Sequence, residues 1–342
     1  MRQIVALVVP AVIALGALTD AAVVEPRLPA AAARAVPAPS QPELLADGIQ
    51  GASGSTVGPG GALFVTEGAT GRILRVDPDT GEVTTFASGL PPSIVGIGGA
   101  IDVAFIGANA YVLVTLVGPD VGGSDVVGIY RVDGPTSAHP IADIGEFALS
   151  HPPMTPFDVP TGLQFAIDVF RGGFLVTDGH HNRVLQVTLD GEVSELMAFG
   201  DIVPTGLAIH GNTIYMAEAG PVPHLPQDGR VVAFGAKPSG VLEVASGAPL
   251  LVDVEFGRGR SLYALSQGVF PAGGAPAEPA LPDTGALLLV DGHGGFIVVA
   301  DGLDRPTSVE LIGDTAYVIT LDGEIWKIPN VSDVAAARVA KP

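Results

Sequence analysis

The chain has 342 residues, a formal net charge of −20 and no cysteine. Without cysteine it can form no disulfide, zinc–thiolate site or thiol nucleophile. The acidic balance, without any stripe of Lys or Arg, excludes a nucleic-acid-binding surface and disfavours attachment to anionic lipid. The 46 glycines, 30 prolines and 15% charged residues are typical of many short buried strands separated by turns.

The N-terminus has the pattern of a secretory signal. Met1 and Arg2 supply a basic start, residues 4–18 are mostly apolar, and small residues follow. We therefore predict a cleaved signal peptide at residues 1–22 and a secreted or extracytoplasmic protein. No second apolar segment has spanning length, so stable membrane insertion is not expected. Residues 23–42 are rich in Ala and Pro, which predicts a disordered linker.

A first structural module follows the linker. Residues 58–61 form a Gly/Pro turn, and residues 62–68 begin with four apolar residues and predict a buried strand. Residues 72–76 alternate between polar and apolar, which predicts a half-buried strand. After the turn at 77–81, where Pro presets φ and Gly accepts a positive φ, residues 82–90 predict an outer strand.

This module is repeated along the chain. The phrase Val-Pro-Thr-Gly-Leu occurs at 159–163 and 203–207, and a close variant occurs at 305–309. We count six modules, beginning near residues 50, 95, 158, 203, 249 and 305. A period of about 40–50 residues is typical of solenoids and propellers.

The last module lacks a fourth strand after residue 329, but residues 43–49 match the fourth strand of the module before it, sharing Ala-Asp-Gly. An N-terminal strand that completes the last sheet would close a ring and remove its exposed edges. The sequence therefore predicts an all-β protein with a single six-bladed β-propeller at 43–330 and four antiparallel strands per blade. Residues 331–342 are a C-terminal tail, and a monomer is expected.

Several of these phrases resemble the ScyD/ScyE family of propeller proteins. They are residues 45–48, 58–67 and 71–76, and the similarity extends over about residues 43–330. The turn and strand phrases are shared with NHL-repeat and gluconolactonase-like propellers. The resemblance implies an exported propeller and supplies no agreed catalytic residues. The family's usual Pro-Arg-Gly phrase in the first module is replaced here by Ala-Ser-Gly at 52–54.

Five acidic residues are predicted to converge near the channel on one face of the propeller. Three of them end second strands and two lie within first strands; they are Glu67, Asp178, Glu218, Asp102 and Asp253. Five carboxylates could hold Ca²⁺, which takes six to eight oxygen ligands, and a cation would relieve their repulsion. The alternative is a solvated acidic rim in which the first-strand Asp residues cap backbone N–H groups. No cofactor is certain, and calcium is the candidate.

The same face is predicted to carry other polar candidates. Thr161, Thr205 and Thr307 begin first strands in the repeated phrase. His180 and His224 lie in loops between second and third strands, where a His could act as a base or metal ligand, or have no role beyond the loop. Adjacent residues on a strand point opposite ways, so at most one of His180 and His181 faces the channel. Long loops at 118–126, 220–229 and 268–285 belong to this face.

These observations predict a protein that binds an unknown ligand or protein partner on the loop-rich face around the channel. The alternative is a hydrolase or lactonase in which Glu67, Asp178 and Glu218 hold a divalent ion that polarises a carbonyl or activates water. A third interpretation is a scaffold for protein assembly with no small-molecule site. No serine or cysteine nucleophile motif occurs, which favours binding over catalysis.

Overall fold

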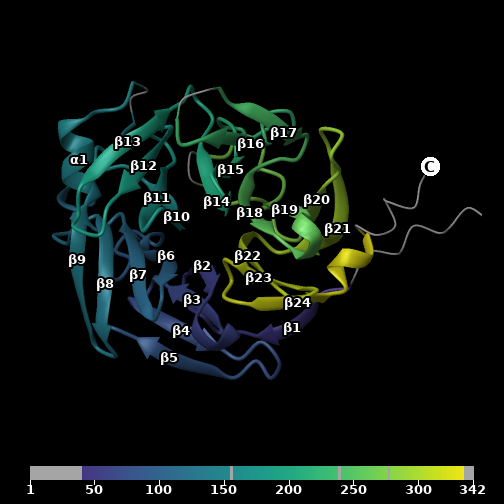
Figure 1. The fold of residues 1–342 in the computed structure, drawn as a ribbon, viewed down its shortest axis with the longest axis horizontal. Coiled ribbons are helices and arrows are strands. Elements are labelled where there is room, and N and C mark those ends of the chain that lie inside the picture. Colours follow the sequence, from purple (N-terminus) through teal and green to yellow (C-terminus); the bar gives the residue numbers. More distant parts are fainter. Residues whose placement is uncertain (1–40, 155–156, 238–239, 276–277, 335–342) are drawn as a thin grey trace, which may run out of the picture. The chain divides into compact units, whose positions relative to one another are not determined.

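The computed structural model describes residues 41–154, 157–237, 240–275 and 278–334. Their strands form six four-stranded antiparallel sheets, arranged as blades around a central axis (Figure 1). The predicted six-bladed propeller is confirmed. The predicted signal peptide and nearly all of the predicted linker lie outside the described residues.

Each blade takes its strands in chain order from the axis outward, except the last. Blade 1 consists of β2 (Ala52–Val57), β3 (Leu63–Glu67), β4 (Arg72–Val76) and β5 (Val83–Ala87). Blade 2 consists of β6 (Gly99–Ile106), β7 (Asn109–Thr115), β8 (Gly128–Gly134) and β9 (Ser137–Asp143). Blade 3 consists of β10 (Gln164–Phe170), β11 (Gly173–Asp178), β12 (Arg183–Val187) and β13 (Val193–Ala198). Blade 4 consists of β14 (Pro204–His210), β15 (Thr213–Glu218), β16 (Arg230–Gly235) and β17 (Leu242–Ser246). Blade 5 consists of β18 (Leu251–Phe256), β19 (Leu262–Ser266), β20 (Gly285–Val290) and β21 (Phe296–Leu303). Blade 6 is β22 (Pro306–Ile312), β23 (Thr315–Thr320), β24 (Ile325–Pro329) and β1 (Glu43–Ala46).

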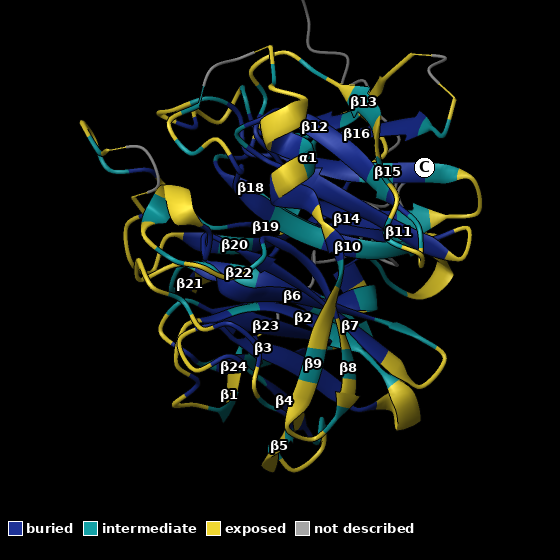
Figure 2. Ribbon diagram, turned by 90° about the vertical axis from the view of Figure 1, so that its left-hand side faces the viewer, coloured by how far each residue is buried: buried dark blue, intermediate teal, exposed yellow. Residues whose placement is uncertain are grey.

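Burial explains why inner and outer strands differ in sequence. Both faces of an inner strand pack against neighbouring blades, so all five residues of β3 are buried. The outer strand β5 is exposed along most of its length. Figure 2 shows the same gradient, with buried strands inside and exposed hairpins at the periphery.

The hydrophobic core is divided among the interfaces between blades. Phe64 and Val112 belong to the cluster between blades 1 and 2, and Phe174 belongs to the cluster between blades 2 and 3. The remaining interfaces are filled in the same way. Because each blade buries its faces against its neighbours, closure of the ring buries the faces of the first and last blades as well.

Strand β1 closes the ring as the sequence predicts. It pairs antiparallel with β24, with Glu43 opposite Lys327 and Leu44 opposite Trp326. The strand is shorter than the predicted 43–49, but the chain continues inward and Ile49 is buried between blades 6 and 1. The Ile49 backbone N–H donates to Gly323 O at 3.1 Å, and this hydrogen bond holds the segment after β1 against blade 6.

Some local structure is not predicted from the repeat. A helix α1 (Ile144–Ser150) begins at Asp143, whose carboxylate accepts a hydrogen bond from the Glu146 N–H. Short 3₁₀ turns occur at η1 (Pro59–Gly61), η2 (Pro119–Val121) and η3 (Arg258–Arg260). The start of the predicted tail, residues 331–334, is helical and buries Val331 and Val334 against the core of blades 5 and 6. Among the described residues, no helix has the length and apolarity to cross a membrane.

Candidate functional site

In blades 4 and 6 the repeated Pro-Thr phrase occupies a bulge at the start of a first strand. In every blade the register between the first and second strands shifts near this point. In blade 4 the shift falls between Pro204 and Leu207, and the Thr205 hydroxyl lies 2.9 Å from Leu251 O of the next blade. The Thr307 hydroxyl likewise donates to Ser53 O at 2.8 Å, linking blade 6 to blade 1. The two hydroxyls therefore connect neighbouring blades.

Thr161 is placed differently from the other two predicted threonines. It lies in a turn before β10, so the prediction that it begins a first strand is wrong. Its hydroxyl and its backbone N–H both donate to Asp120 Oδ2, at 2.7 and 2.9 Å. The reason is local: blade 3 enters its first strand later, at Gln164.

The three predicted carboxylates at the ends of second strands each lie opposite an arginine on the adjacent third strand. The cross-strand pairs are Glu67 with Arg72, Asp178 with Arg183, and Glu218 with Arg230. Glu67 forms an ion pair with Arg72 and accepts from Thr70. In blades 1 and 3 the carboxylate is therefore neutralised within its own sheet.

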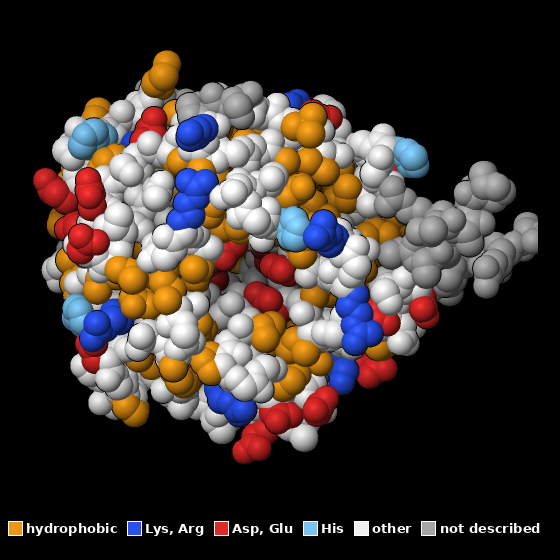
Figure 3. Space-filling view, viewed as in Figure 1, with side chains coloured by type: hydrophobic (Ala, Val, Ile, Leu, Met, Phe, Trp, Pro, Cys, Tyr) orange, Lys and Arg blue, Asp and Glu red, His pale blue; other side chains and the backbone are white. Residues whose placement is uncertain are grey.

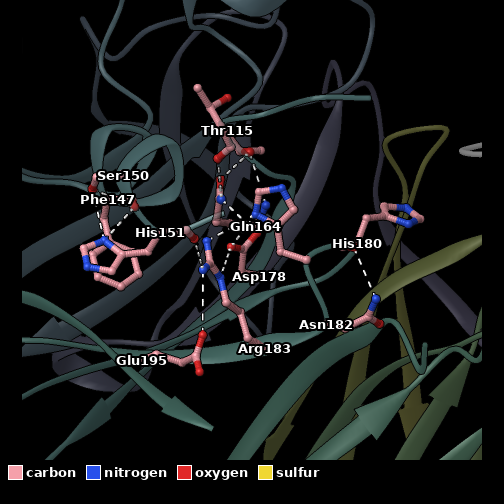
Figure 4. A network of polar contacts seen from close by, with 12 residues as sticks. Thr115, Phe147, Ser150, His151, Gln164, Asp178, His180, Asn182, Arg183 and Glu195 are labelled. Atoms are coloured by element: carbon pink, nitrogen blue, oxygen red, sulfur yellow. Dashed lines mark hydrogen bonds and ion pairs between the residues drawn. The ribbon is translucent and has the colours of Figure 1, made fainter. Parts of the chain in front are cut away.

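Asp178 is the centre of a fully buried polar network (Figure 4). Its Oδ2 accepts from Arg183 Nε at 2.8 Å and lies 3.0 Å from His181 Nδ1, and its Oδ1 accepts from Gln164 Nε2 at 3.2 Å. Gln164 Oε1 accepts in turn from the Thr115 hydroxyl of blade 2. This network joins two blades and leaves Asp178 no free oxygen for a ligand.

Glu218 is buried without a partner. It is 4% exposed, and its carboxylate makes no hydrogen bond or ion pair with any described residue. Burial raises its pKa to about 7, against a smaller opposing effect of Arg230. Glu67, Asp178 and Glu218 all lie outside the lining of the central channel among the described residues.

Asp102 and Asp253 do line the channel, and each holds two blades together. Asp102 accepts from the backbone N–H of Val103 and of Ile167 in the next blade, both at 2.8 Å. Asp253 accepts from Val254 and, in the next blade, from Val309. A Cβ at Gly54 or Gly206 of the preceding blade would collide with the corresponding Asp Oδ1, which explains these glycines. Asp102 and Asp253 therefore cap backbone amides, as the alternative to a calcium site predicts.

The channel forms a continuous cavity of about 650 Å³ along the axis. We call it the channel cavity. Acidic side chains are visible in the central hollow in Figure 3, surrounded by hydrophobic ones. Four of its acidic residues are absent from the sequence-based prediction: Glu278 in the loop before β20, and Asp168 of β10, Glu255 of β18 and Glu310 of β22.

Asp168, Glu255 and Glu310 lie at the same height along the axis of the propeller, in one layer. They pair with Leu175, Tyr263 and Tyr317, each of which lies three residues before the last residue of its second strand. Blades 1, 2 and 4 carry Thr56, Ala104 and Ala208 at the equivalent positions. The acidic layer is therefore confined to blades 3, 5 and 6.

The channel carboxyls have raised pKa values. Burial is the main cause, and it raises the pKa of Asp168 to about 7, of Glu255 to about 8 and of Asp253 to about 6. The pKa of Glu310 is raised well above its usual value by burial and then by the charges of Glu255, Asp253, Asp102 and Asp168. Like charges in a space of low polarity oppose one another's ionisation.

Loops from the predicted face form one mouth of the channel cavity. His180, His224, Gln267 and Glu278 line it, all from loops between second and third strands. His180 stacks on Phe157, with ring centroids 4.5 Å apart. His181 points elsewhere, into the Asp178 network, so only one of the adjacent histidines lines the channel, as predicted.

His224 is held in one tautomer. Its Nδ1 lies 2.7 Å from Gly220 O, and because a carbonyl can only accept, Nδ1 carries the proton. Burial lowers the pKa of His224, so the ring is neutral near pH 7 and Nε2 offers a lone pair. The residue is 6% exposed, has φ +54°, and makes no hydrogen bond through Nε2 to a described residue. Such strained, desolvated positions are common at functional sites.

The donor set does not fit a metal ion. Within the described ranges, no group of three or more His, Asp or Glu side chains is placed to hold one. Glu67 and Asp178 are bound to arginines, and Asp102 and Asp253 hold backbone amides. As calcium ligands the five predicted residues remain a prediction, and we derive no chemistry through a metal.

Comparison with known proteins shows the fold. No protein-family model and no curated protein sequence matches the chain. Among solved structures, a gluconolactonase from Xanthomonas campestris has a TM-score of 0.59 at 14% identity, over 85% of this chain and 89% of its own. The chain shares the fold of gluconolactonase-like six-bladed propellers.

Other similar structures have different activities. The PQQ-bound aldose sugar dehydrogenase from Streptomyces coelicolor has a TM-score of 0.55 at 15% identity, over 86% of this chain and 99% of its own. A chain of the nidogen/laminin complex has a TM-score of 0.52 at 15% identity, over 76% of this chain and 84% of its own. The fold thus accommodates enzymes and protein-binding modules, and function must be argued from the site.

Proposed function

We propose that this protein binds a small organic ligand in the channel cavity, entering from the mouth lined by His180 and His224. The observation that carries the proposal is a cavity of about 650 Å³ that joins this mouth to the acidic layer. That volume is typical of sites for small organic molecules. The resemblance to ScyD/ScyE proteins, which implies no catalytic residues, is compatible with binding alone.

A channel-blocking variant tests this proposal. Ala166 lines the cavity from β10, whereas Ala198 of β13 is exposed on an outer strand. In a thermal-shift screen of small organic molecules, ligands that stabilise the protein should lose their effect with Ala166→Trp and keep it with Ala198→Trp. A ligand at 100 times its Kd stabilises the folded state by about 2.7 kcal/mol. Ligands that stabilise both variants equally would contradict binding in the channel.

A second candidate function is hydrolysis of a lactone with His224 as the base. The observation that favours it is that His224 lines the cavity and its Nε2 has no hydrogen-bond partner among the described residues. A neutral imidazole in this state can accept a proton from an attacking water. The gluconolactonase among the similar structures makes a sugar lactone a reasonable first substrate.

Hydrolysis of glucono-1,5-lactone at pH 7 measures this activity. We expect His224→Ala to lower the rate by about 10²–10⁴-fold, the usual contribution of a general base. His293→Ala is the matched control, because that residue lies in an exposed hairpin. Hydrolysis no faster than in buffer, or unaffected by His224→Ala, would exclude the lactonase function and leave the binding function standing.

A further inference from the structure

The charged lining of the channel cavity is of one sign. Among the described residues that line it there are six carboxyl side chains and neither Lys nor Arg. They are Asp102, Asp168, Asp253, Glu255, Glu278 and Glu310. Asp102 is buried, Glu278 is exposed and the other four are half-buried. Carboxylates withdrawn from water are normally neutralised by a partner, so the absence of a basic residue among these lining residues needs an explanation.

Free oxygens concentrate in the layer formed by Asp168, Glu255 and Glu310. Asp168 uses Oδ1 to accept from the Val169 N–H, and Glu255 uses Oε1 to accept from the Phe256 N–H, leaving one oxygen free on each. The Glu310 carboxyl makes no hydrogen bond or ion pair with any described residue. The layer therefore offers four acceptor oxygens to the cavity.

An independent observation comes from the mouth of the same cavity. His224 is more than nine-tenths buried and lines the cavity, and its Nε2 lone pair has no partner among the described residues. It is an acceptor, because Nδ1 holds the ring proton. A ligand that meets both His224 and the acidic layer must present hydrogen-bond donors.

Aromatic side chains form part of the remaining lining. Phe165 lies near the mouth with its ring 6.4 Å from that of His180, and Phe105 and Phe256 line the cavity from the first strands of blades 2 and 5. An organic molecule can use these surfaces, but a bare metal ion cannot. The described residues also provide no group of three ligands for a metal.

We propose that the ligand is an organic cation, an amine whose ammonium group lies among Asp168, Glu255 and Glu310 and whose apolar part contacts the aromatic lining. This inference rests on the proposed function and specifies the ligand's chemistry. An ammonium group donates up to three hydrogen bonds, which the free oxygens of this layer can accept. Its charge replaces the missing basic partner.

Binding of an amine should release protons. A protonated carboxyl in the layer would lose its proton to solvent as it pairs with the ammonium, so that the net change is one carboxyl ionised and one proton released. Burial and mutual repulsion raise the pKa values of these groups to about 7 and about 8 for Asp168 and Glu255. The release should therefore be larger near pH 6–7 than at pH 9.

Calorimetric titration with three isosteric probes tests the inference. The probes are 2-phenylethylamine, 2-phenylethanol and phenylacetate, titrated into the full chain at pH 8. We expect the amine to bind at least about tenfold more tightly than the alcohol, with no binding of the carboxylate. Glu310→Gln should weaken amine binding about tenfold, equivalent to about 1.4 kcal/mol. Glu82→Gln, in an exposed turn, should leave it unchanged.

The outcomes separate this inference from the proposed function. Alcohol or carboxylate binding as tightly as the amine, or an unchanged Kd in Glu310→Gln, would overturn the cationic ligand and leave channel binding intact. Calcium chloride that binds with the same dependence on Glu310 would assign the layer to a metal and also overturn it. If no probe binds, the inference fails, and the Ala166→Trp screen alone decides whether the channel binds a ligand.

Discussion

Replacing Arg183 with Met should lower the free energy of unfolding by about 3–5 kcal/mol, the usual cost of leaving a buried charge without its partner. The Arg183 side chain is 1% exposed. Its Nε donates to Asp178 at 2.8 Å, its Nη1 donates to His151 O at 2.7 Å, and its guanidinium lies 5.4 Å from the centre of the Phe147 ring. Methionine keeps the packing but leaves Asp178 with only His181 and Gln164.

Two further variants separate the buried charge from simple loss of contacts. Arg230→Met removes the equivalent arginine of blade 4, whose ion pair with Glu243 is exposed on both sides, and should cost no more than about 1 kcal/mol. The double variant Arg183→Met with Asp178→Leu should recover most of the loss, since an apolar pair of similar volume needs no neutralisation. Urea unfolding measures all three. A loss below about 1 kcal/mol in Arg183→Met would show that Asp178 is neutralised by other groups.

The repeat predicts the propeller because it reports on packing. In blades 4 and 6 the phrase places a hydroxyl at the first-strand bulge, and this hydroxyl reaches the next blade, as at Thr205 and Thr307. The closing strand was predictable for a similar reason, because residues 43–49 carry the outer-strand pattern that the last module lacks. In blade 3 the phrase is kept without the strand, and there Thr161 contacts Asp120 instead.

The second-strand carboxylates show what sequence reasoning missed. A signal was present, because Arg72 and Arg183 each follow their carboxylate by five residues, the spacing that a tight hairpin converts into a cross-strand pair. The two residues therefore neutralise each other inside a blade. In blade 4 the longer loop separates Glu218 from Arg230 in sequence, although the strands still align them.

The acidic layer could be recognised only in part. Asp168, Glu255 and Glu310 lie in first strands. A charged residue between apolar neighbours in a strand indicates that its side chain faces water, a cavity or a polar group. The bulge shifts the register by a residue or more after each strand begins, so position along the strand does not give height in the channel. The common layer of these residues appears only from their cross-strand partners.

Stability without ligand should fall as the pH rises from 5 to 9. In the unfolded chain Asp and Glu ionise near pH 4. In the folded protein burial holds the pKa of Asp168 at about 7 and that of Glu255 at about 8, and the pKa of Glu310 is raised further by burial and the four facing carboxyls. The folded state therefore keeps protons that the unfolded state has lost, and stability is greatest at low pH and is lost as these groups ionise.

The size and origin of this loss can be measured against a variant. Each pH unit by which folding raises a pKa corresponds to about 1.4 kcal/mol, so we expect the free energy of unfolding to fall by several kcal/mol between pH 5 and pH 9. The triple variant Asp168→Asn, Glu255→Gln, Glu310→Gln removes these ionisations and should be more stable than the wild type at pH 9.

The other titrating groups are the same in the wild type and in the triple variant, so their effects cancel in the difference between the two free energies of unfolding. Glu218 contributes in the same direction, since burial raises its pKa to about 7. His180 and His224 act oppositely, because burial lowers their pKa values and stability is lost below about pH 6.5 as they protonate in the unfolded chain. Urea unfolding at each pH gives the free energy of unfolding of the wild type and of the triple variant, and the difference between the two isolates the acidic layer. Parallel curves would mean that the layer is already neutralised, and they would remove the electrostatic reason for a cationic ligand.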